Sequence, residues 1–240
     1  MIRHSILLLA SLLVTSACGL HQAPGQPGAN SPPAKILDFR LLYGRNCAGC
    51  HGENGHGGAA IGLRDPVYLA IADDAAIARV TADGVPGTAM PAFAQRSGGM
   101  LTDDQIGAIV RGIRSHWAKP DFLRGAEPPP YTASQTGDAR RGAGVYGTFC
   151  SSCHGPDGTG GVRAGSIVDG AYLQLVSNQG LRTIVIAGRP DLSAPDWRGD
   201  LPGRPMSPQD VSDVVAWLVA QRPALPGQTD FSAGIRGGVR

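Results

Sequence analysis

The chain has 240 residues, of which 42% are hydrophobic, 5% aromatic and 17% charged, enough for one large domain or two small ones with apolar cores. This composition excludes a collagen-like, coiled-coil or wholly disordered chain. The formal charge is only +2, from 21 basic and 19 acidic residues, so no nucleic-acid-binding surface is indicated. The 35 glycines and 19 prolines predict short helices joined by long irregular loops.

The N-terminus has the pattern of an export signal. Arg3 precedes an apolar run, ILLLASLLV, from Ile6 to Val14, and small residues follow as far as Ala17. This run is too short for a permanent transmembrane helix. Residues 1–17 are therefore predicted to be a signal peptide.

Cys18 directly follows the predicted signal peptide. The residues TSAC that end at Cys18 resemble a bacterial lipobox, whose cysteine becomes the lipidated N-terminus, although Thr15 stands where leucine is usual. The alternative is a secreted protein with an unpaired cysteine. Residues 18–34 are rich in proline and glycine, so we expect them to form a tether between the lipidated Cys18 and the folded part of the chain.

The other four cysteines form two C-x-x-C-H motifs. They are Cys47 and Cys50 in CAGCH, and Cys150 and Cys153 in CSSCH. Such a motif attaches c-type haem: the two thiols add across the haem vinyl groups, and the adjacent histidine ligates the iron. A thioredoxin-like pair would not require the histidine, and a zinc site would have to bring two distant motifs together. We therefore predict two covalently bound haem c groups, with His51 and His154 as proximal ligands.

The motifs belong to a longer internal repeat. Leu41–Gly57 recurs as Gly144–Gly160 at an offset of 103 residues, and Tyr68–Gly84 recurs as Tyr172–Gly188 at an offset of 104. Repetition over such a span indicates a duplicated structural unit.

The repeat closes with an amphipathic helix in each half, at an offset of 105 residues. After Thr102 and after Ser207, apolar residues occur at i, i+3, i+4 and i+7, which places them on one helical face. Thr102 with Gln105 predicts a capping box, and Ser207 precedes a proline at the first helical position.

In these motifs and this repeat, from Leu37 to about Gln221, the chain resembles the class I cytochromes c, and specifically the two-domain dihaem electron carriers of bacterial periplasms. The resemblance implies an all-α fold of two tandem class I cytochrome c domains, each a small helical fold around a covalent haem. We expect domain 1 at residues 35–119, a linker at 120–137, domain 2 at 138–222 and a flexible tail at 223–240. Domains 1 and 2 are called the first and second repeat below.

The family pattern also implies the helices of each repeat. They are Ile36–Cys50, Asp74–Ala82 and Thr102–Trp117 in the first, and Asp138–Cys153, Asn178–Ala187 and Ser207–Ala220 in the second. Gly112 stands where the second repeat has Trp217, the aromatic that such closing helices press onto the first helix. We therefore expect looser helix packing in the first repeat.

The resemblance implies an axial methionine in each repeat, and here the two repeats differ. Met90, in TAMPAF, stands where the family places the thioether sulfur that ligates iron. The matching position 104 residues later is Ala194, in SAPDW. Met206 is the only later methionine, and it is either a displaced ligand or a side chain that packs beneath the following helix. His154 is the only histidine of the second repeat.

These observations predict an exported, lipid-anchored dihaem cytochrome c on the periplasmic face of a bacterial membrane. It would relay single electrons between a donor and an acceptor protein, while the redox chemistry belongs to the haem. No Ser-His-Asp order, phosphate loop or carboxylate pair indicates catalysis. Two alternatives remain open: an enzyme or a gas or peroxide sensor with an open second haem, and an electron-transfer subunit of a larger respiratory membrane complex.

Overall fold

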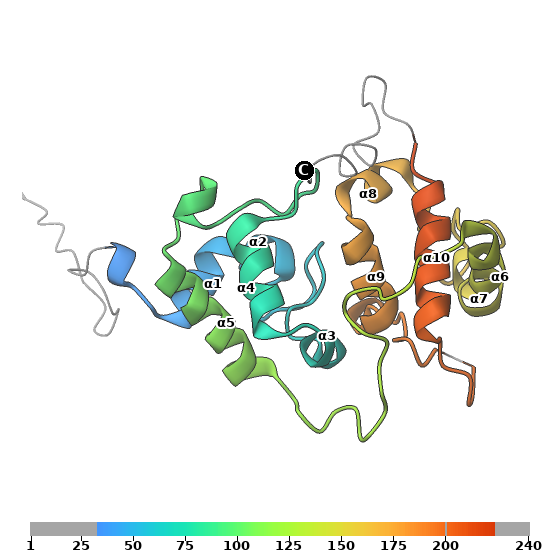
Figure 1. Cartoon of the computed structure of the whole chain (residues 1–240), viewed down its shortest axis with the longest axis horizontal. Helices are drawn as coiled ribbons and strands as arrows, with labels where there is room; N and C mark the ends of the chain where they lie inside the picture. Colours follow the sequence, from blue (N-terminus) through green and yellow to red (C-terminus); the bar gives the residue numbers. More distant parts are fainter. Residues whose placement is uncertain (1–32, 200, 224–240) are drawn as a thin grey trace, which may run out of the picture.

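The computed structural model describes residues 33–199 and 201–223, and these are helical, with isolated β-bridges as the only extended pairing among them (Figure 1). The prediction of an all-α fold is confirmed. The predicted signal peptide, Cys18 and almost all of the tether and tail lie outside the described residues. Within the described part of the chain, no helix combines the length and apolar character needed to cross a membrane.

Short capped helices build the first repeat. They are η1 (Pro33–Lys35), α1 (Phe39–Asn46), α2 (Ala48–His51), α3 (Pro66–Ile71), α4 (Asp74–Asp83), η2 (Gln95–Ser97) and α5 (Asp103–Trp117). The side chains of Asp38, Asp65 and Asp73 accept hydrogen bonds from the first turns of α1, α3 and α4. Thr102 and Gln105 form the predicted capping box of α5. Each such cap contributes about 1 kcal/mol.

Apart from η1, which has no counterpart, the second repeat has the same order of helices. They are α6 (Ala139–Phe149), α7 (Ser151–His154), α8 (Gly170–Leu175), α9 (Asn178–Ala187), η3 (Pro190–Leu192) and α10 (Pro208–Ala220). Asp169, Ser177 and Ser207 cap α8, α9 and α10 in the way that their counterparts do in the first repeat. Asp138 caps α6, which begins about one turn farther from its motif than α1 does.

Two details differ from the expected helices. The first helix of each repeat is interrupted at a motif cysteine, Cys47 or Cys150, which ends one helix and begins the next. Helices α3 and α8 were not anticipated, because six residues are too few to display a helical period. Their sequence signal is a single capping aspartate.

The expected looser packing in the first repeat is seen in the helix pair as a whole, since α1 contacts α5 less extensively than α6 contacts α10, although Gly112 itself is closely packed. Helix α1 packs on α5, and a β-carbon at Gly112 would lie 2.0 Å from the ring of Phe39. In the second repeat the sizes are exchanged: Gly142 is the counterpart of Phe39, and Trp217 is the counterpart of Gly112. A β-carbon at Gly142 would lie 2.8 Å from Cβ of Trp217. The bulky side chain is on the opposite helix in the second repeat, where Gly142 also lets α6 approach the backbone of α10, since the same β-carbon would lie 2.1 Å from the carbonyl of Asp213.

Each repeat also has a tryptophan at the contact between its first and closing helices. Trp117 contacts Tyr43 edge to face, with ring centroids 5.0 Å apart, and lies against Gly55. Trp217 stacks on Tyr146, the counterpart of Tyr43, at 4.2 Å and lies against the glycine that matches Gly55. Trp117 therefore occupies the position of Trp217, although it comes from one helical turn farther along the chain.

In each repeat, one arginine near the end of the closing helix forms hydrogen bonds to the two middle helices. Arg222 donates to the carbonyls of Leu173 and Val176, at 2.9 and 2.6 Å, and to the side chain of Asn178 at 2.6 Å. Arg114 makes the same three contacts in the first repeat, with Leu69, Ala72 and Asp74. The end of α8 or α3 is thereby joined to the next helix and to the closing helix. The two arginines are 108 residues apart, outside the register of the closing helices.

The two repeats contact each other through α3 and α9, which lie side by side at the centre of Figure 1. The linker is held to the same helix, because Arg182, 3% exposed, donates to the carbonyls of Pro130 and Tyr131 and to the hydroxyl of Ser212. Buried apolar side chains of both repeats belong to one contiguous cluster. The described part of the chain is therefore a single packed body.

Candidate functional site

The first C-x-x-C-H motif lies on one turn of helix. Cys47 is the residue between α1 and α2, and its carbonyl accepts hydrogen bonds from the backbone N–H of Cys50 and His51, at 3.2 and 3.0 Å. This turn places both thiols and the imidazole at neighbouring positions of α2. None of the four motif cysteines forms a disulfide.

The imidazole of His51 is oriented by a backbone carbonyl. Its Nδ1 lies 2.8 Å from the carbonyl oxygen of Ile61, and the side chain is 8% exposed. Since a carbonyl only accepts, Nδ1 carries the proton, and Nε2 keeps the lone pair that a metal needs. Burial lowers the pKa of His51, which favours the neutral form required of a ligand.

The second motif has the same geometry. The carbonyl of Cys150 accepts from the N–H groups of Cys153 and His154, at 3.1 and 3.0 Å. Nδ1 of His154 lies 2.7 Å from the carbonyl of Gly165, the counterpart of Ile61. Both motifs thus combine an imidazole whose Nε2 is free to ligate with two neighbouring thiols, the donor set that a covalently attached haem requires.

The environment of two of the motif thiols, those of Cys47 and Cys150, does not favour thiolate chemistry. Burial, and then the charge of the neighbouring thiol, raise the pKa of Cys47 and that of Cys150 to about 11 each. Reactive and zinc-binding cysteines are thiolates at neutral pH, whereas a sulfur that has formed a thioether bond to haem carries no such charge. Among the described residues, no cluster of three or more histidine, cysteine or acidic side chains could hold a metal ion, so the two motifs do not converge on a zinc site.

Glycines allow the loop after each motif to fold back onto it. A β-carbon at Gly58 would lie 2.1 Å from the carbonyl of Cys50, and one at Gly161, its counterpart, 2.5 Å from that of Cys153. Only glycine permits this approach. The returning loop supplies the carbonyl that orients each histidine.

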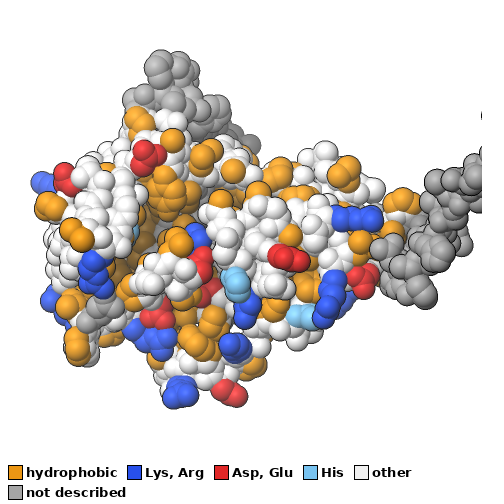
Figure 2. All heavy atoms as spheres, turned by 180° about the vertical axis from the view of Figure 1, so that it is seen from behind, with side chains coloured by type: hydrophobic (Ala, Val, Ile, Leu, Met, Phe, Trp, Pro, Cys, Tyr) orange, Lys and Arg blue, Asp and Glu red, His pale blue; other side chains and the backbone are white. Residues whose placement is uncertain are grey.

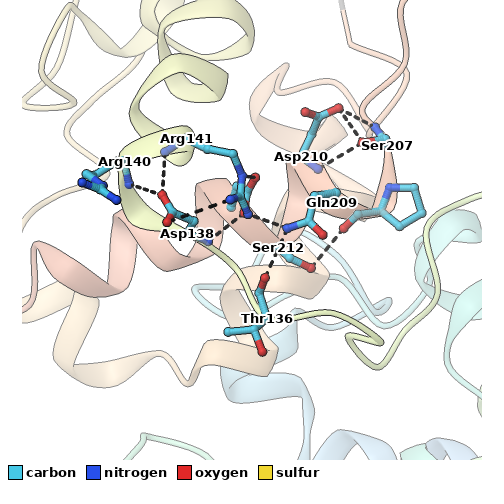
Figure 3. Close-up of polar contacts among 10 residues, drawn as sticks. Thr136, Asp138, Arg140, Arg141, Ser207, Gln209, Asp210 and Ser212 are labelled. Atoms are coloured by element: carbon cyan, nitrogen blue, oxygen red, sulfur yellow. Dashed lines mark hydrogen bonds and ion pairs between the residues drawn. The ribbon is translucent and has the colours of Figure 1, made fainter.

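Charged contacts fix the helix that leads into the second motif. Arg141 of α6 donates through Nε to Asp213 of α10 at 2.8 Å, and Gln209 donates to the same carboxylate at 2.8 Å (Figure 3). Asp138, at the start of α6, also donates through its backbone N–H to Asp213, at 2.7 Å. The hydrogen bond from Arg141, and then those from Asp138 and Gln209, hold the pKa of Asp213 below its usual range. Helix α6 is thereby held in place on α10.

The candidate ligand Met90 lies on a loop with defined hydrogen bonds. Its carbonyl accepts from the N–H of Val85 at 2.9 Å, and its N–H donates to the hydroxyl of Thr88 at 3.2 Å. The side chain is half-buried. Met90 is therefore held in a closed turn directly after α4.

The second repeat holds Ala194 in the same turn. Arg189 and Ala194, the counterparts of Val85 and Met90, exchange backbone hydrogen bonds of 3.1 and 3.0 Å. Met206 is not part of this turn: it is 7% exposed and belongs to the apolar core. Seen from behind, the second repeat lies on the left of Figure 2, where hydrophobic side chains gather in a hollow of the surface.

One contact joins the two candidate sites. The guanidinium of Arg189 donates to the carbonyl of Gly58 at 3.0 Å and pairs with Asp191 at 2.8 Å. The loop after the first motif thus touches the loop that carries Ala194. No pattern in the sequence indicates this contact, because the two residues are 131 positions apart.

Comparison with known proteins finds a family match in both repeats. Residues 34–111 and 137–218 match the family described as "Cytochrome C oxidase, cbb3-type, subunit III". Together the two segments cover about two thirds of the chain.

Two kinds of curated relative are similar to the chain. The cbb3-type cytochrome c oxidase subunit CcoP of Azospirillum sp. is 32% identical over 151 residues, which are 56% of this chain and 45% of that protein. The match thus spans less than half of the Azospirillum protein. The cytochrome bc1 complex cytochrome c subunit of Mycobacterium bovis is 25% identical over 230 residues, which are 92% of this chain and 78% of that protein.

Solved structures show only weak likeness. A Kuenenia stuttgartiensis reducing HAO-like protein complex is 18% identical, with a TM-score of 0.41, over 77% of this chain and 96% of that one. Thiosulfate dehydrogenase from Marichromatium purpuratum is 21% identical, with a TM-score of 0.35, over 80% of this chain and 45% of that one. These values support no functional argument.

Proposed function

The chain belongs to the family of cytochrome c oxidase, cbb3-type, subunit III, and on that premise we propose that it is a dihaem cytochrome c that relays single electrons within a bacterial respiratory complex. The observation that carries the proposal is the duplicated site. Two C-x-x-C-H turns have the same hydrogen bonds, and each orients its histidine through a carbonyl at the same position of the repeat.

Each repeat would hold one haem c. Cys47 and Cys50 would form the thioether bonds of the first haem, with His51 and Met90 as axial ligands. Cys150 and Cys153 would attach the second haem, with His154 as its proximal ligand. The bound haem supplies the reversible one-electron chemistry of iron. The chain supplies covalent attachment, oriented ligands and an apolar surround.

The proposed partners are a donor and an acceptor protein in a respiratory membrane complex. The relatives are subunits of a cbb3-type oxidase and of a bc1 complex, which supports this kind of assembly. Residues 35–117 and residues 138–222 each carry eight basic and eight acidic residues, so docking would not depend on a strong uniform charge. Export by the predicted signal peptide and a lipid on Cys18 would place the chain at the periplasmic membrane surface.

Haem stoichiometry tests the proposal. The full chain, produced in a bacterium that exports and matures c-type cytochromes, should retain two covalent haems after denaturation, measured by intact mass and pyridine haemochrome. Replacing both motif cysteines by serine in either repeat should remove one haem.

Ser151→Ala is the matched control, because it introduces the residue that the first motif carries at that position, Ala48. This variant should retain both haems. Recovery of fewer than two covalent haems in the wild type, or of zinc in their place, would overturn the proposal.

A further inference from the structure

The second repeat keeps the loop geometry of the first without its ligand. A β-carbon at Gly84 would lie 2.8 Å from the carbonyl oxygen of Met90, and one at Gly188 would lie 2.7 Å from that of Ala194. The hydrogen bond from Val85 to Met90 has its counterpart between Arg189 and Ala194. Ala194 therefore stands in the backbone position of the axial methionine, and its methyl group cannot ligate iron.

The segment that follows Ala194 is also in register with the segment that follows Met90. Trp197 donates through its N–H to the carbonyl of Ile186 at 2.9 Å, as its counterpart Phe93 does to Ala82 at 3.2 Å. Ala194 and the segment that follows it are therefore in register with the first repeat, although the 3-10 turn is η3, before Ala194, in the second loop and η2, after Met90, in the first.

Met206 has a core position that accounts for its burial. Its N–H donates to the carbonyl of Trp197 at 2.8 Å, and the N–H of Leu101 donates to Phe93 at 2.7 Å in the first repeat. Met206 and Leu101 are counterparts, both are buried, and both directly precede a closing helix. To reach iron, Met206 would have to leave a site that an ordinary leucine fills in the first repeat.

The second repeat has no further histidine, unattached cysteine or lysine that could ligate the iron. His154 is its only histidine, both of its cysteines belong to the motif, and it contains no lysine. Beside Ala194, Arg189 is paired with Asp191, so the adjacent charges cancel. The surroundings of Ala194 therefore favour a small neutral molecule over an ion.

We propose that the second haem has no distal side-chain ligand from this chain and binds a small neutral diatomic molecule there, whereas the first haem is closed by Met90. This inference rests on the proposed attachment of a haem to Cys150 and Cys153. It adds ligand binding to the electron relay, and it divides the two functions between the two repeats.

The test uses carbon monoxide as the probe and exchanges residues between the repeats. The full dihaem protein, with two haems verified by pyridine haemochrome, is reduced with dithionite and titrated with carbon monoxide in the Soret region. The wild type and Met206→Leu should each bind one carbon monoxide per chain. Ala194→Met should bind at least tenfold more weakly, and Met90→Ala should bind two per chain.

Each remaining outcome overturns the inference. Binding only after Met206→Leu would identify Met206 as the ligand, and no binding to either form would require a ligand from outside the second repeat. Undiminished binding to Ala194→Met would place the open iron elsewhere. Haem content is measured separately, so loss of a haem would count against the proposed function, and a full haem content without carbon monoxide binding against this inference alone.

Discussion

At the scale of single residues, the two histidines are the most constrained groups of the candidate sites. The carbonyls of Ile61 and Gly165 hold Nδ1 of His51 and His154, at 2.8 and 2.7 Å. Such an outer hydrogen bond orients a ligand and raises its basicity. The distal position therefore distinguishes the two sites, since one loop offers Met90 and the other Ala194.

Met90→Ala should lower the reduction potential of the first haem by on the order of 100 mV, because a methionine ligand raises the potential and axial ligation sets potentials over a range of roughly 0.8 V. A spectroelectrochemical titration of the full protein measures it. Met100→Ala is the control, since that side chain is 80% exposed and should leave both potentials unchanged. Equal potentials for wild type and Met90→Ala would remove Met90 as a ligand.

At the scale of helices, the contact between the first and closing helices is kept by different residues in each repeat. Phe39 lies over Gly112 in one, and Trp217 lies beside Gly142 in the other. Close packing requires the total side-chain volume at a contact to be conserved, but the larger side chain can come from either helix. A comparison of single positions does not show that Phe39 fills the space over Gly112, and the contact between α6 and α10 is still the more extensive of the two.

Gly112→Ala should reduce the free energy of unfolding by about 1–3 kcal/mol, because its methyl group would overlap the ring of Phe39. Thermal and denaturant unfolding of the full protein, followed by circular dichroism, measures the change. Gly44→Ala in α1 is the control: nothing lies within 4 Å of its β-carbon, and alanine favours a helix by up to about 1 kcal/mol. Similar destabilisation by both substitutions would contradict the packing described.

At the scale of the whole molecule, the contact between α3 and α9 and the linker bonds of Arg182 join the two repeats. The bond from Arg189 to Gly58 places the two candidate sites on one body. An electron relay benefits from this arrangement, because the two haems would keep a constant separation. The proposed tether would then set where that body lies relative to the membrane.

Lipid anchoring is tested on the full chain in the exporting bacterium. The mature protein should begin at a lipidated Cys18 and sediment with membranes, since attachment by two or more acyl chains is stable. Cys18→Ser should shift it to the soluble periplasmic fraction without loss of haem. An unmodified N-terminus at another residue in the wild-type mass spectrum would exclude the anchor.

The sequence alone showed the duplication, and its resemblance to the class I cytochromes c predicted the all-α fold and most helix ends. The capping residues, amphipathic periods and C-x-x-C-H spacing that carry this resemblance act over a few residues. The sequence also located Met90 and Ala194 at matching places, which the matching turns explain. It did not show that Trp117 replaces Trp217, that Arg222 repeats the contacts of Arg114, or that Met206 has the core position of Leu101. Those relations join residues far apart in the chain, and they are decided by which side chains fill a shared volume or pair with a distant carbonyl. Only the packed structure specifies such neighbours.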